Sequence, residues 1–371
     1  MTIRPFQLER FFARWEFEAP YLLCASDCET MSIGELLALG DTPLSTLTEL
    51  RLGYTESQGD PALRETIAGF YPALSAEQVL VANAPEEAIF LTMMTLLEAG
   101  DRVVVQSPCY QSLSEIAAYR GAEVQGWPLA ETERGWRLDL DQLAALLTPA
   151  TKLLVINAPH NPTGYLPSPA EFETILTLVA DRGIWLFCDE MYRGLEYDPA
   201  QRLPSASTRY ERAISLWGTS KTFGLPGLRL GWLVLQHAPL LQDLLRFKDY
   251  TTICSSGPGE LLARLALENA EAIIARNLAL IQQNLGHMQT FLTACPDIFD
   301  WRTPLAGPIA FARLKQGSAQ AFSEETVRAC GVLLAPSTNF DFGDSHVRFG
   351  LGRQNFAAGL SVLQDYLQTT G

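Results

Sequence analysis

Short apolar runs alternate with segments of helical periodicity through the first two thirds of this chain. The runs are rich in valine, isoleucine and leucine, which is typical of strands that are buried on both faces. Strands are predicted at 78–82, 102–106, 123–128, 152–157, 184–188, 213–216 and 231–235. Helices are predicted between them at 61–70, 86–97, 110–119, 139–147 and 169–182. This alternation predicts an α/β fold with a mostly parallel sheet flanked by helices.

The pattern changes near residue 240. Residues 239–250 and 259–292 have helical periodicity, and short strands are then predicted at 309–314, 331–335 and 346–351 before a closing helix at 356–368. Two short helices are expected near the start, at 6–17 and 32–39. A chain of 371 residues is long for a single core. We therefore predict a large domain over 46–268 and a smaller α+β domain formed by 1–45 together with 269–371.

Composition narrows the class of protein. Hydrophobic residues make up 47% of the chain and charged residues 19%, which favours a compact globular protein over a disordered one. The formal net charge of -15 argues against nucleic acid or an anionic membrane as a partner, because both require clustered cations. The first residues lack the apolar core of a signal peptide, and no apolar stretch is long enough to span a membrane.

The cysteines and histidines carry no metal-site or disulfide pattern. The seven cysteines are scattered, odd in number and without a Cys-x-x-Cys pair, and the four histidines have no metal-ligand spacing. We expect no metal. Free thiols also fit a reducing compartment, so a cytoplasmic location is predicted.

Polar clusters follow three of the predicted strands, at 157–164, 189–192 and 217–232. Ligands of open parallel sheets bind at the carboxyl ends of the strands, so we expect these clusters to meet at one site. The third cluster contains Lys221 among small and apolar residues, and Arg229 follows it. Taken alone, both could be surface cations in a glycine-rich loop. A lysine in apolar surroundings, however, shifts toward the neutral amine, which can form a Schiff base with a carbonyl.

The order of motifs resembles a known family. Asn161-Pro-Thr-Gly is followed by Asp189-Glu-x-Tyr and then by Ser220-Lys-x-x-Gly-x-x-Gly-x-Arg-x-Gly. This series resembles the fold-type I pyridoxal-phosphate (PLP) enzymes, and more narrowly the class I/II aminotransferases of the aspartate aminotransferase superfamily. The resemblance covers nearly the whole chain. It implies pyridoxal 5'-phosphate as cofactor and identifies the predicted large domain as the one that binds it.

The same resemblance implies roles for four residues around the cofactor ring. Lys221 would hold the cofactor as a Schiff base and later move the proton on the substrate's Cα. Asp189 would pair with the ring nitrogen and keep it protonated. Asn161 and Tyr192 would hydrogen-bond the 3-oxygen of the ring. Lys221, Asp189 and Tyr192 are therefore the predicted catalytic residues.

Other positions match the cofactor's remaining contacts. Ser220 and Arg229 would hold the phosphate, together with backbone amides around Glu86 and Glu87 at the start of a helix. Tyr110 matches the aromatic residue that stacks on the ring.

Two further residues concern the partner subunit and the substrate. Tyr54 matches a tyrosine that reaches the phosphate bound by a partner subunit, so the resemblance implies a homodimer with shared active sites. Arg348 matches the arginine that binds the substrate's α-carboxylate, where Asn161 would also contact the substrate. His160, beside Asn161, has two interpretations: it contacts the substrate, or it is a loop residue packed against the sheet.

The sequence departs from the family in three places. Pro85 stands in the phosphate-binding segment although it has no N–H to donate, and Gly218 stands where many relatives have serine. Third, the N-terminal segment often contains glycine in the family but carries Ser26, Asp27 and Glu29 here. Our hypothesis is that Asp27 or Glu29 receives a cationic substrate side chain. The alternative is a solvated charged loop.

Three functions remain open at this stage. The first is a PLP-dependent aminotransferase that acts on an L-α-amino acid through the Lys221 Schiff base and a quinonoid intermediate. The alternative is elimination or cyclisation of a guanidino or other cationic amino acid, similar to capreomycidine synthase, with the α-amine retained. The third is a non-catalytic ligand-sensing module of the kind fused to DNA-binding domains, which the acidic charge and the missing DNA-binding domain disfavour.

Overall fold

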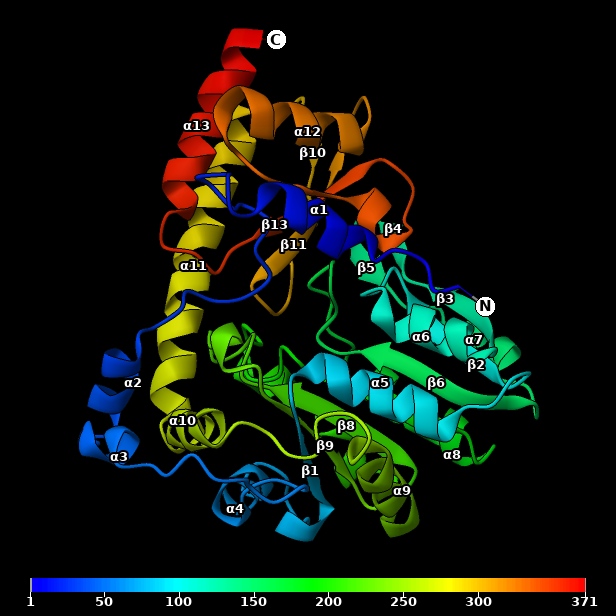
Figure 1. Ribbon diagram of the computed structural model, residues 1–371. Coiled ribbons are helices and arrows are strands. Elements are labelled where there is room, and N and C mark those ends of the chain that lie inside the picture. The colour runs from blue at the N-terminus through cyan, green and yellow to red at the C-terminus, as the bar shows by residue number, and fades with distance from the viewer. Residues whose placement is uncertain (1, 371) are drawn as a thin grey trace.

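The protein was analysed as a computed structural model, which describes residues 2–370 (Figure 1). Its larger sheet has seven strands in the order β1-β9-β8-β7-β6-β2-β3. Their bounds are β1 (Val79–Ala82), β9 (Gly231–Leu235), β8 (Ala213–Gly218), β7 (Trp185–Asp189), β6 (Thr151–Asn157), β2 (Arg102–Ser107) and β3 (Glu123–Pro128). Only the pairs made by β9 are antiparallel. The prediction of a mostly parallel sheet is confirmed.

Helices cover both faces of this sheet because its strands are apolar on both faces. In β6, Leu153 and Val155 pack with α5 (Pro85–Leu96), α6 (Ser112–Arg120) and α9 (Ala238–Lys248). Leu154 and Ile156 point the other way and pack with α7 (Leu140–Leu146) and α8 (Pro169–Ala180). This alternation is the two-residue period of a strand. Two further helices, α4 (Pro61–Ala68) and α10 (Gly257–Glu268), share a core with β1 and β9.

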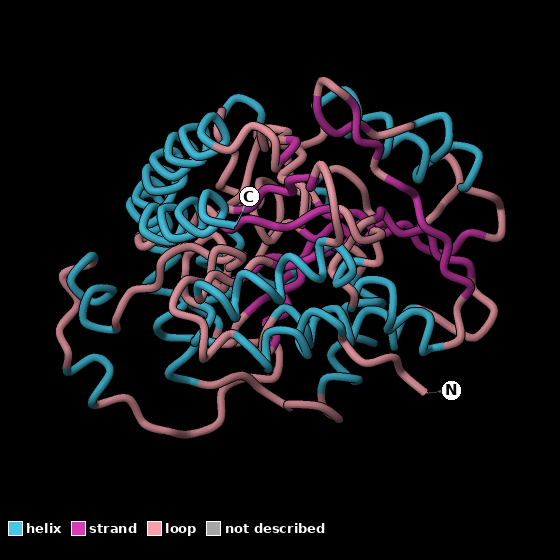
Figure 2. The backbone as a smooth tube through the Cα atoms, turned by 90° about the horizontal axis from the view of Figure 1, so that it is seen from above, coloured by secondary structure: helices cyan, strands magenta, loops and turns pink. Residues whose placement is uncertain are grey.

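A smaller sheet follows in the last part of the chain, with the order β10-β11-β13-β12. Its strands are β10 (Phe299–Asp300), β11 (Ile309–Leu314), β13 (His346–Gly350) and β12 (Ala335–Pro336), and all its pairs are antiparallel. The helices of this part are α11 (Ala270–Ala294), α12 (Ala319–Cys330) and α13 (Phe356–Thr370). Figure 1 shows α11 running beside α13, and Figure 2 shows strands in the middle of the molecule with helices around them. The α/β fold with a smaller α+β part is therefore as expected, while the domain boundaries stay a prediction.

The N-terminal segment packs against the smaller sheet. After α1 (Gln7–Trp15), the chain forms a parallel bridge between Tyr21 and Val332, and Gly350 N donates to Leu23 O over 2.6 Å. A Cβ on Gly350 would overlap the backbone of Ala25, so this crossing requires glycine there. The segment then continues into α2 (Ile33–Leu39) and α3 (Ser45–Thr48).

Some elements differ from the prediction. The helical run expected at 259–292 is broken at Asn269, between α10 and α11. The strand expected at 331–335 is largely absent, because Gly331 ends α12 with a φ of 73° and the following residues run along the N-terminal segment. The remaining short elements, most of them unpredicted, are the hairpin β4 (Ala130–Thr132) and β5 (Gly135–Arg137) and the 3-10 helices η1 (Ala76–Gln78), η2 (Pro199–Gln201), η3 (Ala206–Thr208), η4 (Pro226–Leu228) and η5 (Ser337–Phe340).

Candidate active site

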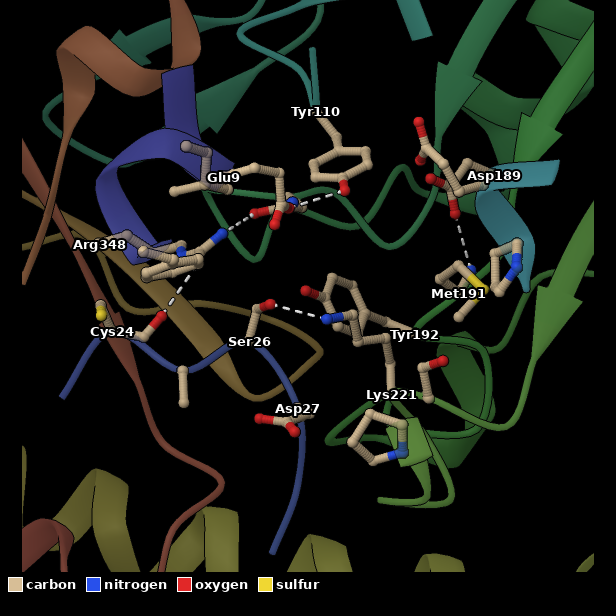
Figure 3. Close-up of a pocket in the computed structure, with 18 of the residues that line it drawn as sticks. Glu9, Cys24, Ser26, Asp27, Tyr110, Asp189, Met191, Tyr192, Lys221 and Arg348 are labelled. Atoms are coloured by element: carbon tan, nitrogen blue, oxygen red, sulfur yellow. Dashed lines mark hydrogen bonds between the residues drawn. The ribbon is translucent and has the colours of Figure 1, made fainter. Parts of the chain in front are cut away.

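A cavity of about 410 Å³ lies at the carboxyl ends of β6, β7 and β8. Residues from α1, from the N-terminal segment and from β13 complete its wall (Figure 3). The structure brings most of the predicted site residues to this one space: Ser26, Asp27, Glu86, Tyr110, Asn161, Asp189, Tyr192, Ser220, Lys221, Arg229 and Arg348.

Three predicted residues do not line the cavity. Glu29 does not line the cavity, and its carboxylate accepts a hydrogen bond from Gln354 N at 2.8 Å, so its contact with substrate stays a prediction. Glu87 uses its carboxylate at the start of α5, where it accepts from Asn83 N at 2.6 Å. Tyr54 is 93% exposed on the surface.

Lys221 follows the end of β8 and extends its amine into the cavity (Figure 3). The amine donates to Ser26 Oγ at 2.9 Å. Burial lowers the pKa of this amine, Arg348 and Arg229 lower it further, and the nearby Asp27 carboxylate opposes them. The neutral, nucleophilic form of Lys221 is thus favoured relative to a free lysine.

Asp189 is the last residue of β7 and is only 6% exposed. Its Oδ1 accepts a hydrogen bond from Met191 N at 3.0 Å. Burial raises the pKa of the carboxyl to about 7, and the Lys221 ammonium only partly offsets this. A buried carboxylate that borders a cavity with a single backbone donor is suited to a cationic partner, such as a protonated ring nitrogen.

Arg348 links the smaller sheet to the larger one. It is fully buried, its Nη1 donates to Asn161 Oδ1 at 3.0 Å, and its Nη2 donates to Cys24 O at 2.9 Å. Its Nε lacks an acceptor within the described part of the chain. Asn161 is in turn held by Asn157, whose Oδ1 accepts from Asn161 N at 2.6 Å. The free Nε leaves this arginine able to bind an anion in the cavity.

The start of α5 has the features of a phosphate site. Within residues 2–370 the N–H groups of Glu86 and Glu87 have no acceptor. The Ser220 hydroxyl is buried without a partner, and the Arg229 side chain also lines the cavity. An open helix N-terminus, a hydroxyl and a guanidinium together fit the phosphate group of PLP.

The departures at Pro85 and Gly218 have one structural cause. Pro85 occupies the first helical position, where its missing N–H costs no hydrogen bond. A Cβ on Gly218 would lie 3.0 Å from Pro85 Cγ, and one on Gly231 would lie 2.9 Å from the same atom. The proline ring therefore requires small residues on β8 and β9, which explains why serine is absent at 218. The neighbouring Glu86 carboxylate accepts from Ser112 Oγ at 3.1 Å, and burial raises its pKa to about 7.

Tyr192 and Tyr110 come from different parts of the chain, and both border the cavity (Figure 3). Tyr192 is buried, which raises the pKa of its phenol. Tyr110 precedes α6, packs against the Phe6 ring at a centroid distance of 4.9 Å, and donates its hydroxyl to Glu9 Oε1 at 3.1 Å. His160 is fully buried, with Nδ1 2.8 Å from Thr163 Oγ1, and burial lowers its pKa to about 3.

Sequence reasoning missed two residues of the site, Glu9 and Glu16. Both lie on the N-terminal helical stretch and line the cavity. The signal for them is their seven-residue separation, which places them on one face of a helix. This spacing identifies site residues only when the helix face is already known to border the cavity.

Fold and site together are those of an enzyme that binds pyridoxal phosphate. The family model for aminotransferase class I and II matches residues 30–361, so the chain belongs to this family of PLP-dependent enzymes. Within residues 2–370, helices long and apolar enough to cross a membrane do not occur.

Relatives include both aminotransferases and cyclases. Capreomycidine synthase from Streptomyces vinaceus is 32% identical over 98% of this chain and 93% of its own. A PLP-dependent aminotransferase from Streptococcus suis is similar in structure, with a TM-score of 0.94 and 29% identity over 100% of this chain and 99% of that one. The PLP-dependent cyclase OrfR has a TM-score of 0.92 and 30% identity, with the same coverage.

Proposed function

We propose that this enzyme removes the amino group of an L-α-amino acid by transamination, with Lys221 as the reactive amine. The observation that carries the proposal is that the Lys221 amine, the Asp189 carboxylate and the Arg348 guanidinium border one cavity. When bound, pyridoxal phosphate supplies an aldehyde that condenses with amines and a ring that withdraws electrons from the substrate's Cα.

The residues of this chain then have the following tasks. Asp189 pairs with the protonated ring nitrogen, which its burial and its single backbone donor support. Arg348 binds the substrate's α-carboxylate through its free Nε. Lys221 accepts the Cα proton at Nζ and returns it to the cofactor carbon that carried the aldehyde. Its lowered pKa makes the amine a better base near neutral pH.

A second candidate is cyclisation or elimination with the α-amine retained. It is favoured by the 32% identity to capreomycidine synthase across 98% of this chain and by the likeness to the cyclase. It needs the same lysine, aspartate and arginine, so the two candidates differ in product alone. Mass spectrometry after a single turnover separates them: a keto acid with an aminated cofactor indicates transamination, whereas a product that keeps its α-amine indicates cyclisation or elimination.

We also propose a homodimer with shared active sites and a cytoplasmic location. Leu52, Tyr54 and Tyr250 are each at least 84% exposed, which supports a surface covered by a second copy of the chain. All seven cysteines are free, which supports a reducing compartment.

The Schiff-base role is tested with the variant Lys221→Ala. We expect the purified wild-type enzyme to absorb visible light and to retain the cofactor covalently after reduction with borohydride. The variant loses the visible band and the covalent adduct, because the amine is absent. Lys315→Ala is the control, since this lysine is remote from the cavity and donates to Pro296 O. An unchanged band and adduct in Lys221→Ala would refute the assignment.

A further inference from the structure

We propose that Glu9 of α1 and Glu16, which caps the C-terminal end of that helix, bind the cationic end of the substrate's side chain, so that the substrate is an amino acid carrying a guanidinium or ammonium group. This inference rests on the proposed function, because it assigns a substrate class to the same cavity.

Both carboxylates face the cavity from one side of α1. Residues seven apart on a helix lie on the same face, about 10 Å apart along its axis. The helix is fixed in place, because Leu8 and Phe11 are buried and Gln7 N donates to Gln111 Oε1 at 2.9 Å. Figure 3 shows Glu9 reaching from this helix to a place between Arg348 and Tyr110. The two acids are therefore held in place in the cavity wall.

The other acids of the cavity already have partners or tasks. Asp27 forms a bidentate ion pair with Arg353, at 2.8 and 2.9 Å, which neutralises the residue that our sequence hypothesis favoured. Asp189 is assigned to the cofactor ring, and Glu86 accepts a hydrogen bond from Ser112.

Among the described residues, neither Glu9 nor Glu16 forms a salt bridge, although the Lys221 ammonium interacts electrostatically with both. Glu9 accepts a hydrogen bond from the neutral Tyr110 hydroxyl, and among the described residues the Glu16 carboxylate has no hydrogen-bond or ion-pair partner. Burial raises the pKa of Glu16, the charges of Glu9 and Asp27 raise it further, and the charges of Arg353 and Lys221 partly offset this. Two carboxylates that destabilise each other across one space are stabilised when a cation enters it.

Unpartnered buried groups in the same cavity point independently to a ligand. Arg348 is 0% exposed and its Nε has no acceptor among residues 2–370, where the buried Ser220 hydroxyl likewise has no partner. The first is placed to bind a carboxylate and the second a phosphate oxygen. An amino acid held by its carboxylate at Arg348 has the two α1 carboxylates within the same enclosed space, so its side chain can reach them.

The test compares L-arginine with L-citrulline, which has nearly the same shape but no charge. Each is titrated into the holoenzyme while the visible absorption of the cofactor is followed. We expect arginine to bind at least tenfold more tightly than citrulline. Glu9→Gln and Glu16→Gln should each reduce this ratio about tenfold, because each removes one charge-assisted hydrogen bond. Glutamine can still accept from Tyr110, so the Glu9 variant preserves that contact.

The matched control is Glu18→Gln, which removes the same charge from an exposed position just beyond α1. It should leave the ratio unchanged. Because the ratio is measured within each variant, a partly misfolded preparation does not alter it. Equal binding of arginine and citrulline by a holoenzyme that responds to other amino acids would overturn this inference alone. Glutamine variants that keep the wild-type ratio would also overturn this inference. In that case Glu9 would only orient Tyr110. A holoenzyme that responds to no amino acid would overturn the proposed function as well.

Discussion

At the scale of single residues, burial rather than neighbouring charge sets the chemistry of the site. Asp189, Glu86 and Lys221 each have a pKa displaced toward the neutral form, with burial as the largest cause. For Lys221 this favours the nucleophile. For Asp189 it means that the ionised form is favoured by a nearby cation, which Lys221 supplies only in part and which a protonated ring would supply under the proposed function. The carboxylate is therefore costly to the empty protein and useful to the loaded one.

The cost of Asp189 predicts an unusual pH dependence for the protein freed of cofactor. Its folded pKa of about 7 lies above the ordinary value of 3.8. Between these values the folded state holds a proton that the unfolded state has released, so the free energy of unfolding falls as pH rises from about 4 to 7. The Asp189→Asn variant has no carboxyl group at this position, so its free energy of unfolding does not fall in this way. We expect the cofactor-free variant to exceed the wild type in stability at pH 8, by on the order of 4 kcal/mol at most.

Urea unfolding of both proteins at pH 4 and pH 8 checks this. Glu86 is present in both proteins, and the Asp189 charge adds to its raised pKa, so the variant also loses that smaller part. Turnover should change in the opposite sense and fall about 100-fold or more, because asparagine cannot pair with a protonated ring nitrogen. A stability difference that is the same at both pH values would contradict the burial argument.

At the scale of elements, the crossing of the N-terminal segment over β13 positions one wall of the site. Gly350 and Gly352 have no side chains to separate the strand from residues 25–28, so the backbones lie in direct contact. This crossing carries Ser26 to the Lys221 amine and Asp27 to Arg353. It also fixes where α1 enters, and with it the place of Glu9 and Glu16.

The variant Gly350→Ala tests this role. Its methyl group would overlap the Ala25 backbone, which must then move. We expect a loss of stability of about 1–3 kcal/mol, measured by urea unfolding, and a loss of turnover larger than the unfolded fraction explains. Gly227→Ala is the control, because that position lies in the lysine loop with open space around its Cα and an ordinary φ. Full activity in a destabilised Gly350→Ala protein would show that the crossing serves stability alone.

At the scale of the whole molecule, the exposed Tyr54 raises the question of a second copy. It is 93% exposed here, while the resemblance assigns it to the phosphate of a neighbouring subunit. If that assignment holds, a single chain lacks one phosphate contact and the dimer supplies it.

A hybrid dimer tests the shared site directly. One chain carries Lys221→Ala and the other Tyr54→Ala, with different affinity tags for purification. If Tyr54 acts across the interface, the hybrid has one intact site and one doubly altered site, and we expect about half of the wild-type activity per dimer. If Tyr54 acts within its own chain, every site is defective and activity stays near that of the two parent variants. Sedimentation analysis of the wild type checks the oligomeric state itself.

The sequence alone determined the larger sheet and the reactive centre, for a physical reason. Apolar periodicity reflects local burial, so it predicted strands such as 152–157 close to their observed bounds. Polar residues that follow parallel strands must meet at one edge of the sheet, so Asn161, Asp189 and Lys221 could be placed together before any coordinates existed.

Tertiary structure alone decided how charge is distributed around the cavity. Asp27 and Glu29 look alike in sequence and both pair with Arg353, but Asp27 lies closer to it and borders the cavity, whereas Glu29 accepts from the backbone N–H of Gln354 and does not line the cavity. Glu9 and Glu16 are ordinary acids of an amphipathic helix until the crossing at Gly350 brings α1 to the cavity. Periodicity depends on neighbours within a few residues, whereas the charge at the site depends on contacts between segments from opposite ends of the chain.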